Sequence, residues 1–145
     1  MEPRKFKTYV DMQVQHQKDI EAIPMSFVFG YRNKEDADKQ VMADLKVNDM
    51  SEVTPLKYGG YVRKADLKFF DDIWKLHDEE HKLFLKDSEE NLVNAIVNEM
   101  YNHEYGYTLD PQDTLMALGK SESDLLNDTR FANAWTKAKS KVLSE

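Results

Sequence analysis

Apolar residues recur with a helical period over most of this chain. The clearest pattern runs from Asp66 to Lys86, where apolar side chains share one arc of a helical wheel and charged side chains lie opposite. A second helical pattern runs from about Glu89 to Tyr105, and a third covers Phe131 to Val142. These patterns predict a mainly helical protein.

Capping residues support further helices and place their ends. A side-chain oxygen directly before an apolar-periodic stretch satisfies one of the free backbone N–H groups of a helix, so it marks the start. The expected N-caps are Thr8, Asn33, Asp110 and Ser121. Gly119 is expected to end the helix that begins after Asp110, because glycine readily adopts the left-handed conformation that closes a helix.

The segment between residues 66 and 105 has two interpretations. Asp87 and Glu90 form a capping-box pattern, which predicts two helices that fold back as a hairpin. Because the segment contains no glycine or proline up to Tyr105, a single continuous helix is the alternative. Such a helix of roughly 39 residues would be about 58 Å long, which is long for a chain of this size. The hairpin is the preferred prediction.

Two other stretches have the composition of strands. Residues 25 to 31 (MSFVFGY) are rich in aromatic and branched side chains, and residues 53 to 64 (VTPLKYGGYVRK) predict two short strands around Gly59-Gly60. Pro55 is expected at a strand start or on an edge strand, because proline cannot donate to a ladder. The predicted fold class is α+β: a mainly helical single domain over residues 1–145, with a small antiparallel β-sheet.

Composition excludes several function classes. The chain has 145 residues and no cysteine, so disulfides and thiol catalysis are absent. No apolar run reaches the roughly 20 residues of a membrane span, and the first residues do not form a signal peptide, so we expect a cytoplasmic protein without membrane contact. The net charge of −7 disfavours direct binding of nucleic acid. Acids concentrated between Asp66 and Glu90 favour a basic partner instead, although a solvated helix face would give the same pattern.

Two histidines on the helix over residues 66 to 86 raise the possibility of a metal site. His77 and His81 match the H-x-x-E-H pattern of some zinc proteases, and Glu99 or His103 could supply a third ligand in a hairpin. The alternative is that both histidines are partly buried and hydrogen-bonded within the helix interface. The alternative is preferred, so no catalytic residue, metal ligand or cofactor is assigned.

The segment NHEYGY, residues 102 to 107, is explained only in part as a helix end. Gly106 is expected to take the left-handed conformation after Tyr105, and Tyr107 to pack back on the helix. Glu104 is unfavourable there, because a carboxylate at the negative end of a helix costs about 0.3–1 kcal/mol unless it is paired. Either a salt bridge to Arg130 or Lys120, or an exposed contact with a partner, would account for it.

Four segments, FKTYVDM, IPMSFVFGY, YGGYVRKAD and NHEYGYTLDPQDTLMALG, resemble a family of small proteins of unknown function carried by phages and mobile elements of gut bacteria. The resemblance implies no catalytic residues. It implies an accessory protein in the host cytoplasm that inhibits a host defence protein, such as a CRISPR effector nuclease, by covering its basic channel. A metal-dependent enzyme using His77 and His81, or a structural or regulatory homodimer, are the alternatives. The expected partner-binding residues are Asp71, Asp78, Glu79, Glu80, Asn102, His103, Glu104, Tyr105 and Tyr107.

Overall fold

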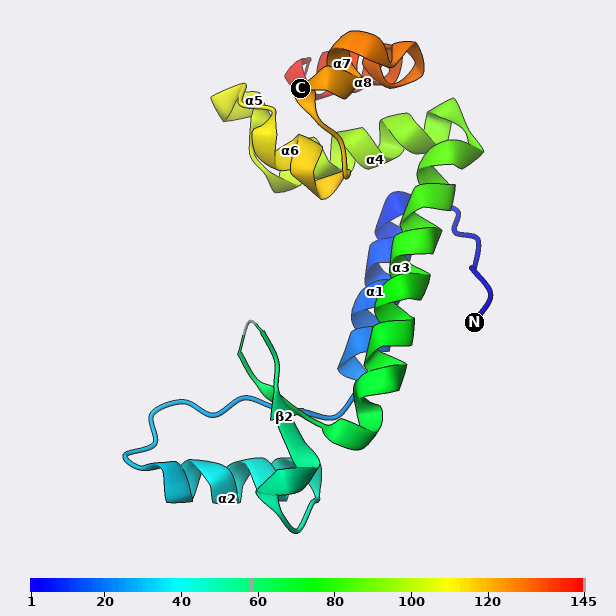
Figure 1. The fold of residues 1–145 in the computed structure, drawn as a ribbon. Coiled ribbons are helices and arrows are strands. Elements are labelled where there is room, and N and C mark those ends of the chain that lie inside the picture. Colours follow the sequence, from blue (N-terminus) through cyan, green and yellow to red (C-terminus); the bar gives the residue numbers. More distant parts are fainter. Residues whose placement is uncertain (58, 145) are drawn as a thin grey trace. The chain divides into compact units, whose positions relative to one another are not determined.

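The computed structural model describes residues 1–57 and 59–144 (Figure 1). It confirms the mainly helical α+β class with a small antiparallel sheet. The helices are α1 Tyr9–Glu21, α2 Lys34–Leu45, α3 Leu67–Asp87, α4 Glu89–Asn102, α5 Tyr105–Thr108, α6 Gln112–Ala117, α7 Glu122–Asn127 and α8 Thr129–Leu143, with short 3₁₀ turns η1 Met50–Glu52 and η2 Lys64–Asp66. The strands are β1 Met25–Ser26, β2 Val53–Pro55 and β3 Tyr61–Arg63.

The chain groups into two compact units. Unit 1 comprises Met1 and Gln15–His77, and unit 2 comprises Glu2–Val14 and Asp78–Glu145. The boundary passes through helices α1 and α3, so each unit contains part of both. The prediction of one domain over residues 1–145 stays a prediction.

Unit 1 contains the sheet, in the order β1-β3-β2 with antiparallel pairing. Pro55 lies on the edge strand β2, as predicted. The strand predicted over residues 25 to 31 is wrong in length, because β1 pairs with β3 only at Met25 and Ser26. Beyond that point Gly30 has a φ of 76°, which a regular strand does not allow.

The predicted turn between β2 and β3 is confirmed at Gly59-Gly60, while Tyr58 lies outside the described residues. Gly60 has a φ of 82°, which favours glycine, and a Cβ there would come within 2.5 Å of the Phe27 ring, so a larger residue would also displace that ring. Unit 1 buries a small apolar cluster between α2 and the sheet, made of Val41, Leu45 and Val53. Asn33 caps α2 as predicted, accepting a hydrogen bond from the backbone N–H of Asp36 at 2.9 Å.

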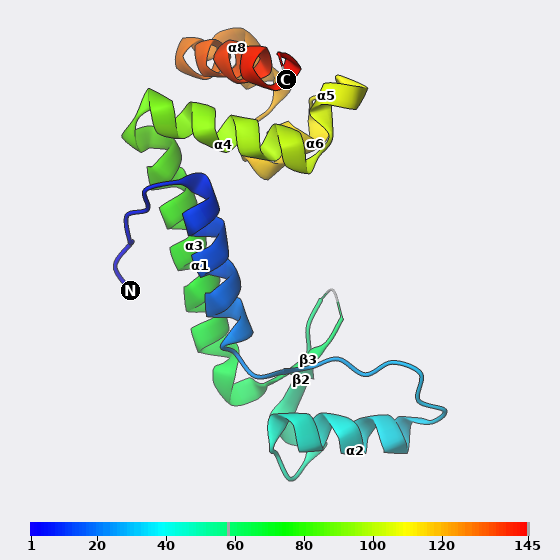
Figure 2. The same cartoon turned by 180° about the vertical axis from the view of Figure 1, so that it is seen from behind.

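Unit 2 is helical, and residues 66 to 105 form two helices rather than one. The predicted Asp87 capping box is wrong by one residue: Ser88 is the N-cap, and its hydroxyl accepts from the Asn91 N–H at 3.0 Å. Helix α4 packs most extensively along α8, which lies beside it in both views, and not along α3 as a hairpin would require (Figure 2). The apolar stripe of α8 explains why α4 packs along α8, because this stripe is buried against α4. Its members are Phe131, Ala134, Trp135, Ala138 and Val142.

The remaining predicted caps are largely confirmed. Thr8 accepts from the Asp11 N–H, Gly119 has a φ of 67°, and Ser121 forms a capping box with Asp124. The exception is Asp110, which accepts from the N–H of Gln112 but lies one residue before the N-cap, Pro111. None of the described helices has the length and apolar character needed to cross a membrane.

Candidate functional site

The turn after α4 places Glu104 on the surface of unit 2. His103 ends the helix, with its N–H bonded to the Glu99 carbonyl at 3.0 Å. Glu104 then adopts the left-handed conformation, with φ 55° and ψ 33°. The prediction that Gly106 takes this role is wrong, because Gly106 lies inside α5.

Burial of Tyr105 explains this shift. Tyr105 is buried in the unit 2 core, where its ring meets the edge of Trp135 at a centroid distance of 5.6 Å. The chain has to reverse before Tyr105 to bury that ring, so the left-handed residue is Glu104. A non-glycine residue in this conformation costs roughly 1 kcal/mol or more. Tyr105 was predicted to touch a partner, and its burial rules out that role.

Glu104 lies in a small hollow of about 280 Å³ on unit 2. Two exposed tyrosines line it: Tyr107 is 92% exposed and Tyr101 is 48% exposed. The other lining residues are Met100, Gly106, Val142 and Leu143. Among the described residues, the hollow therefore combines one carboxylate, two aromatic rings and aliphatic walls, and none of these lining residues is basic.

The Glu104 carboxylate has no side-chain partner within residues 1–57 and 59–144. The predicted salt bridges are wrong, since Arg130 donates to the backbone carbonyls of Leu85 and Ser88, and Lys120 lies over the Phe131 ring. Of the two explanations that the sequence leaves open, the salt bridge is absent from the described residues, and contact with a partner stays a prediction. Burial of Tyr105, and the Tyr107 and Thr108 N–H groups that donate to the Glu104 carbonyl, accompany the left-handed backbone, but none of these contacts involves the Glu104 carboxylate.

The other predicted residues of this segment have mainly structural roles. Asn102 is exposed but donates to the Glu99 carboxylate at 2.6 Å. His103 is half-buried at the end of α4. The predicted contact region of residues 102 to 107 therefore narrows to Glu104 and Tyr107, with Tyr101 added by the fold.

The acidic region predicted on α3 is also smaller than the sequence indicates. Asp71, Asp78 and Glu79 are exposed. Glu80 was predicted to contact a partner, but it is only 1% exposed and has a structural role instead. Both of its carboxylate oxygens accept from Arg4: Oε2 from Nε at 2.7 Å and Oε1 from Nη2 at 2.9 Å. Apart from the buried Glu80, α3 carries five acidic residues and four lysines, so its surface gives only a weak negative field.

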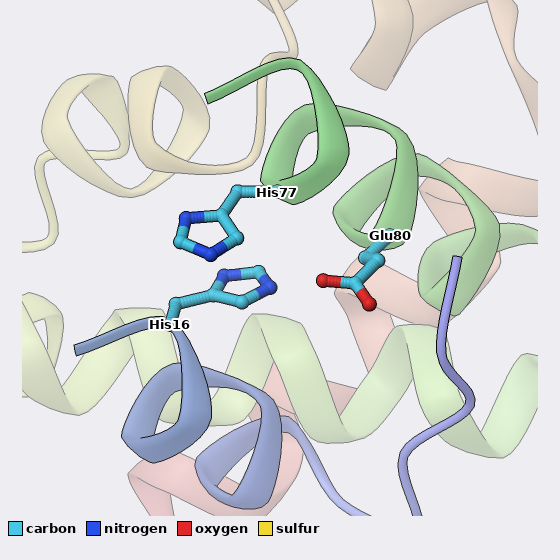
Figure 3. Close-up of side chains that lie close together, drawn as sticks. All are labelled: His16, His77 and Glu80. Atoms are coloured by element: carbon cyan, nitrogen blue, oxygen red, sulfur yellow. The ribbon is translucent and has the colours of Figure 1, made fainter. Parts of the chain in front are cut away.

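His16 on α1, and His77 and Glu80 on α3, carry side chains of the types that ligate metals (Figure 3). Within unit 1, the rings of His16 and His77 stack at a centroid distance of 3.8 Å, with 17° between their planes. Nitrogen lone pairs lie in the ring plane, so stacked rings direct them alongside each other and not toward one ion. His77 Nε2 also bonds Asp19 at 2.8 Å. Within unit 2, the Glu80 carboxylate forms an ion pair with the Arg4 guanidinium group. These residues fit an ion-pair and stacking arrangement better than a metal site.

His81, the second histidine of the H-x-x-E-H pattern, belongs to a buried network in unit 2. Its Nε2 lies 3.2 Å from the Tyr9 hydroxyl, which donates to Glu99 Oε2 at 3.2 Å. A carboxylate only accepts, so the hydroxyl proton points to Glu99 and the Tyr9 oxygen accepts from an Nε2–H of His81. Burial, followed by the nearby Glu99, raises the pKa of Tyr9 far above its ordinary value. The preferred prediction of hydrogen-bonded histidines is thus confirmed for both His77 and His81.

The His81 network predicts a pH dependence of stability. Burial is the main cause that lowers the pKa of His81 below its ordinary value, against the opposing effect of Glu99. Below about pH 6.5 the unfolded chain binds a proton at this position that the folded chain resists, so the free energy of unfolding falls as the pH drops. We expect a His81→Gln variant to lose less stability than the native chain between pH 7 and pH 5, by up to about 1.4 kcal/mol per pH unit. Urea unfolding at each pH measures this, and identical slopes would contradict it.

Several residues of these arrangements carry no signal in the sequence. Arg4 and Glu80 are 76 residues apart, and Tyr9 and Glu99 are 90 residues apart. Val142 fits the helical stripe of α8, but nothing in that stripe shows that it also borders the Glu104 hollow.

Comparisons with known proteins place the chain in a family without assigning it an activity. The profile of the Family of unknown function (DUF7659) matches residues 8–141. No curated protein and no solved structure gives a significant match.

Proposed function

This chain belongs to that family of unknown function, and we propose from its own residues that it is a protein-binding domain that docks on a basic surface of a partner protein. The observation that carries the proposal is Glu104. Its exposed side chain has no side-chain partner in the described chain, its backbone is left-handed, and it lines a hollow together with two exposed tyrosines. Exposed aromatic residues beside a polar group are typical of contact regions between proteins.

The distribution of charge supports a basic partner. Unit 2 contains 16 acidic residues against 10 lysines and arginines, a net charge of −6, whereas unit 1 contains 11 against 10. A negative surface attracts a positive one over a distance and speeds association. Asp71, Asp78 and Glu79 on α3 add to this general attraction, while the Glu104 hollow supplies the specific contact.

The resemblance to phage and mobile-element proteins of gut bacteria supports a narrower proposal. The partner is then a host defence protein that handles nucleic acid, for example a CRISPR effector nuclease. The chain acts inside the host cell by covering the basic channel of that protein. This form of the proposal requires that binding excludes nucleic acid from the partner, which a competition assay with labelled DNA or RNA measures.

Substitution of Glu104 separates binding from folding. Asparagine tolerates the left-handed conformation better than glutamate, so we expect Glu104→Asn to raise the free energy of unfolding by about 0.5–1 kcal/mol. The same variant, used as bait in a bacterial host lysate, should lose the partner that the native chain recovers. Urea unfolding and quantitative mass spectrometry measure the two effects.

Glu79→Gln is the matched control, because it removes one exposed negative charge outside the hollow. It should retain the partner, with only slightly slower association. If Glu104→Asn and the native chain recover the same proteins in the same amounts, the proposal is wrong.

A further inference from the structure

We propose that the hollow around Glu104 is a pocket for a single arginine side chain of the partner. The inference rests on the proposed function and adds the chemistry of the ligand. The hollow of about 280 Å³ is at the small end of the roughly 300–1,000 Å³ of ligand sites, a size that suits a single side chain.

The hollow has a carboxylate, aromatic rings and aliphatic side chains, and each of these suits a part of an arginine side chain. The Glu104 carboxylate can accept two parallel N–H bonds from a guanidinium group. The exposed rings of Tyr101 and Tyr107 offer faces for stacking and cation–π attraction. The aliphatic side chains of Val142 and Leu143 can pack against the methylene stem.

Lysine fits the same walls less well. Its ammonium group is a strongly hydrated point charge that cannot form the bidentate pair and does not stack on an aromatic face as a flat guanidinium does. An acidic or neutral ligand would leave Glu104 without a counter-charge. The net charge of −6 on unit 2 disfavours an anion further.

The arginines of unit 2 do not fill the hollow, so we assign the arginine to the partner. The two arginines that unit 2 contains are both engaged elsewhere: Arg4 pairs with Glu80, and Arg130 donates to the carbonyls of Leu85 and Ser88. Unit 2 therefore presents an arginine-complementary hollow that its own arginines do not fill.

The test uses the isotope-labelled full chain and three small probes. N-acetyl-arginine amide is titrated against N-acetyl-lysine amide and N-acetyl-citrulline amide, the last being an uncharged molecule of nearly the same shape. We expect the arginine probe to shift the backbone amide signals of residues 101 to 107 and 142 to 143 saturably. The lysine probe should bind at least about fivefold more weakly, and the citrulline probe should cause no saturable shift.

Substitutions in the hollow test whether the arginine probe binds there. Glu104→Gln should weaken the arginine probe by about tenfold or more, and Tyr107→Leu by several-fold. Glu2→Gln removes an exposed negative charge of unit 2 outside the hollow and should leave the affinity for the arginine probe unchanged. Tyr107 is almost fully exposed, so its replacement leaves the core intact, and unchanged amide signals outside the hollow verify folding of each variant.

Equal binding of the lysine or citrulline probe, shifts centred elsewhere, or an unaffected Glu104→Gln variant would each overturn the arginine assignment. The lysate experiment then separates this failure from that of the proposed function. If the probes show no arginine preference but Glu104→Asn still loses a partner, protein binding stands and only the ligand chemistry is wrong. If neither experiment responds to Glu104, both proposals fall.

Discussion

Replacing Arg4 with methionine is expected to lower the free energy of unfolding by about 3 kcal/mol, which corresponds to a fall in Tm of roughly 10 °C for a chain of this length. The Glu80 side chain has no exposed surface, and its oxygens accept from Arg4 through the backbone N–H at 2.7 Å and through the guanidinium group. Without the guanidinium group, the buried carboxylate keeps its desolvation cost and loses its counter-charge. The lower end of the usual range applies, because the Arg4 side chain is 36% exposed.

Two variants check this cause. Lys5→Met changes a neighbouring exposed residue in the same way and should alter stability by less than about 0.5 kcal/mol. In the Arg4→Met/Glu80→Leu double variant the unpaired charge is gone, so this protein should be more stable than Arg4→Met alone. A double variant that is less stable than Arg4→Met would show that packing, and not the ion pair, determines the effect.

Replacing Tyr9 with phenylalanine is the second large effect, with an expected loss of about 2 kcal/mol. The Tyr9 hydroxyl donates to the Glu99 carboxylate and lies next to His81 Nε2. Phenylalanine keeps the packing of the ring but leaves a buried carboxylate, only 6% exposed, with one donor fewer. Denaturant unfolding near pH 7.5 measures the loss while His81 is neutral in both states.

Tyr107→Phe is the matched control for Tyr9→Phe, because it removes a hydroxyl from a tyrosine at the surface. Its stability should stay within about 0.5 kcal/mol of the native value. If both variants lose the same amount, the buried network does not account for the contribution of Tyr9.

Local signals in the sequence predicted helix ends well. Thr8, Asn33 and Ser121 cap helices through hydrogen bonds to residues only three positions away, so the local sequence is enough to predict them. The one-residue error at Asp87 has the same origin: Asp87 and Ser88 are both good caps, and packing decides between them.

The left-handed turn after α4 could not be predicted in the same way. Local propensity places it at Gly106, but the core must bury Tyr105 against Trp135, which lies 30 residues further along the chain. Tertiary packing therefore outweighs the preference of glycine for this conformation. The Glu104 hollow arises from that shift, so the sequence indicated an unexplained glutamate without indicating its pocket.

The short strand β1 has a consequence for how this protein behaves in concentrated solution. Beyond Ser26 the chain carries Phe27 and Phe29, which are 55% and 85% exposed, within a stretch from Ile23 to Tyr31 that contains no charged residue. An aromatic, uncharged segment that continues an edge strand can pair with its copy in another molecule and start aggregation. The charges that flank it, Glu21 and Arg32, oppose parallel in-register pairing, because each charge would then face its own copy.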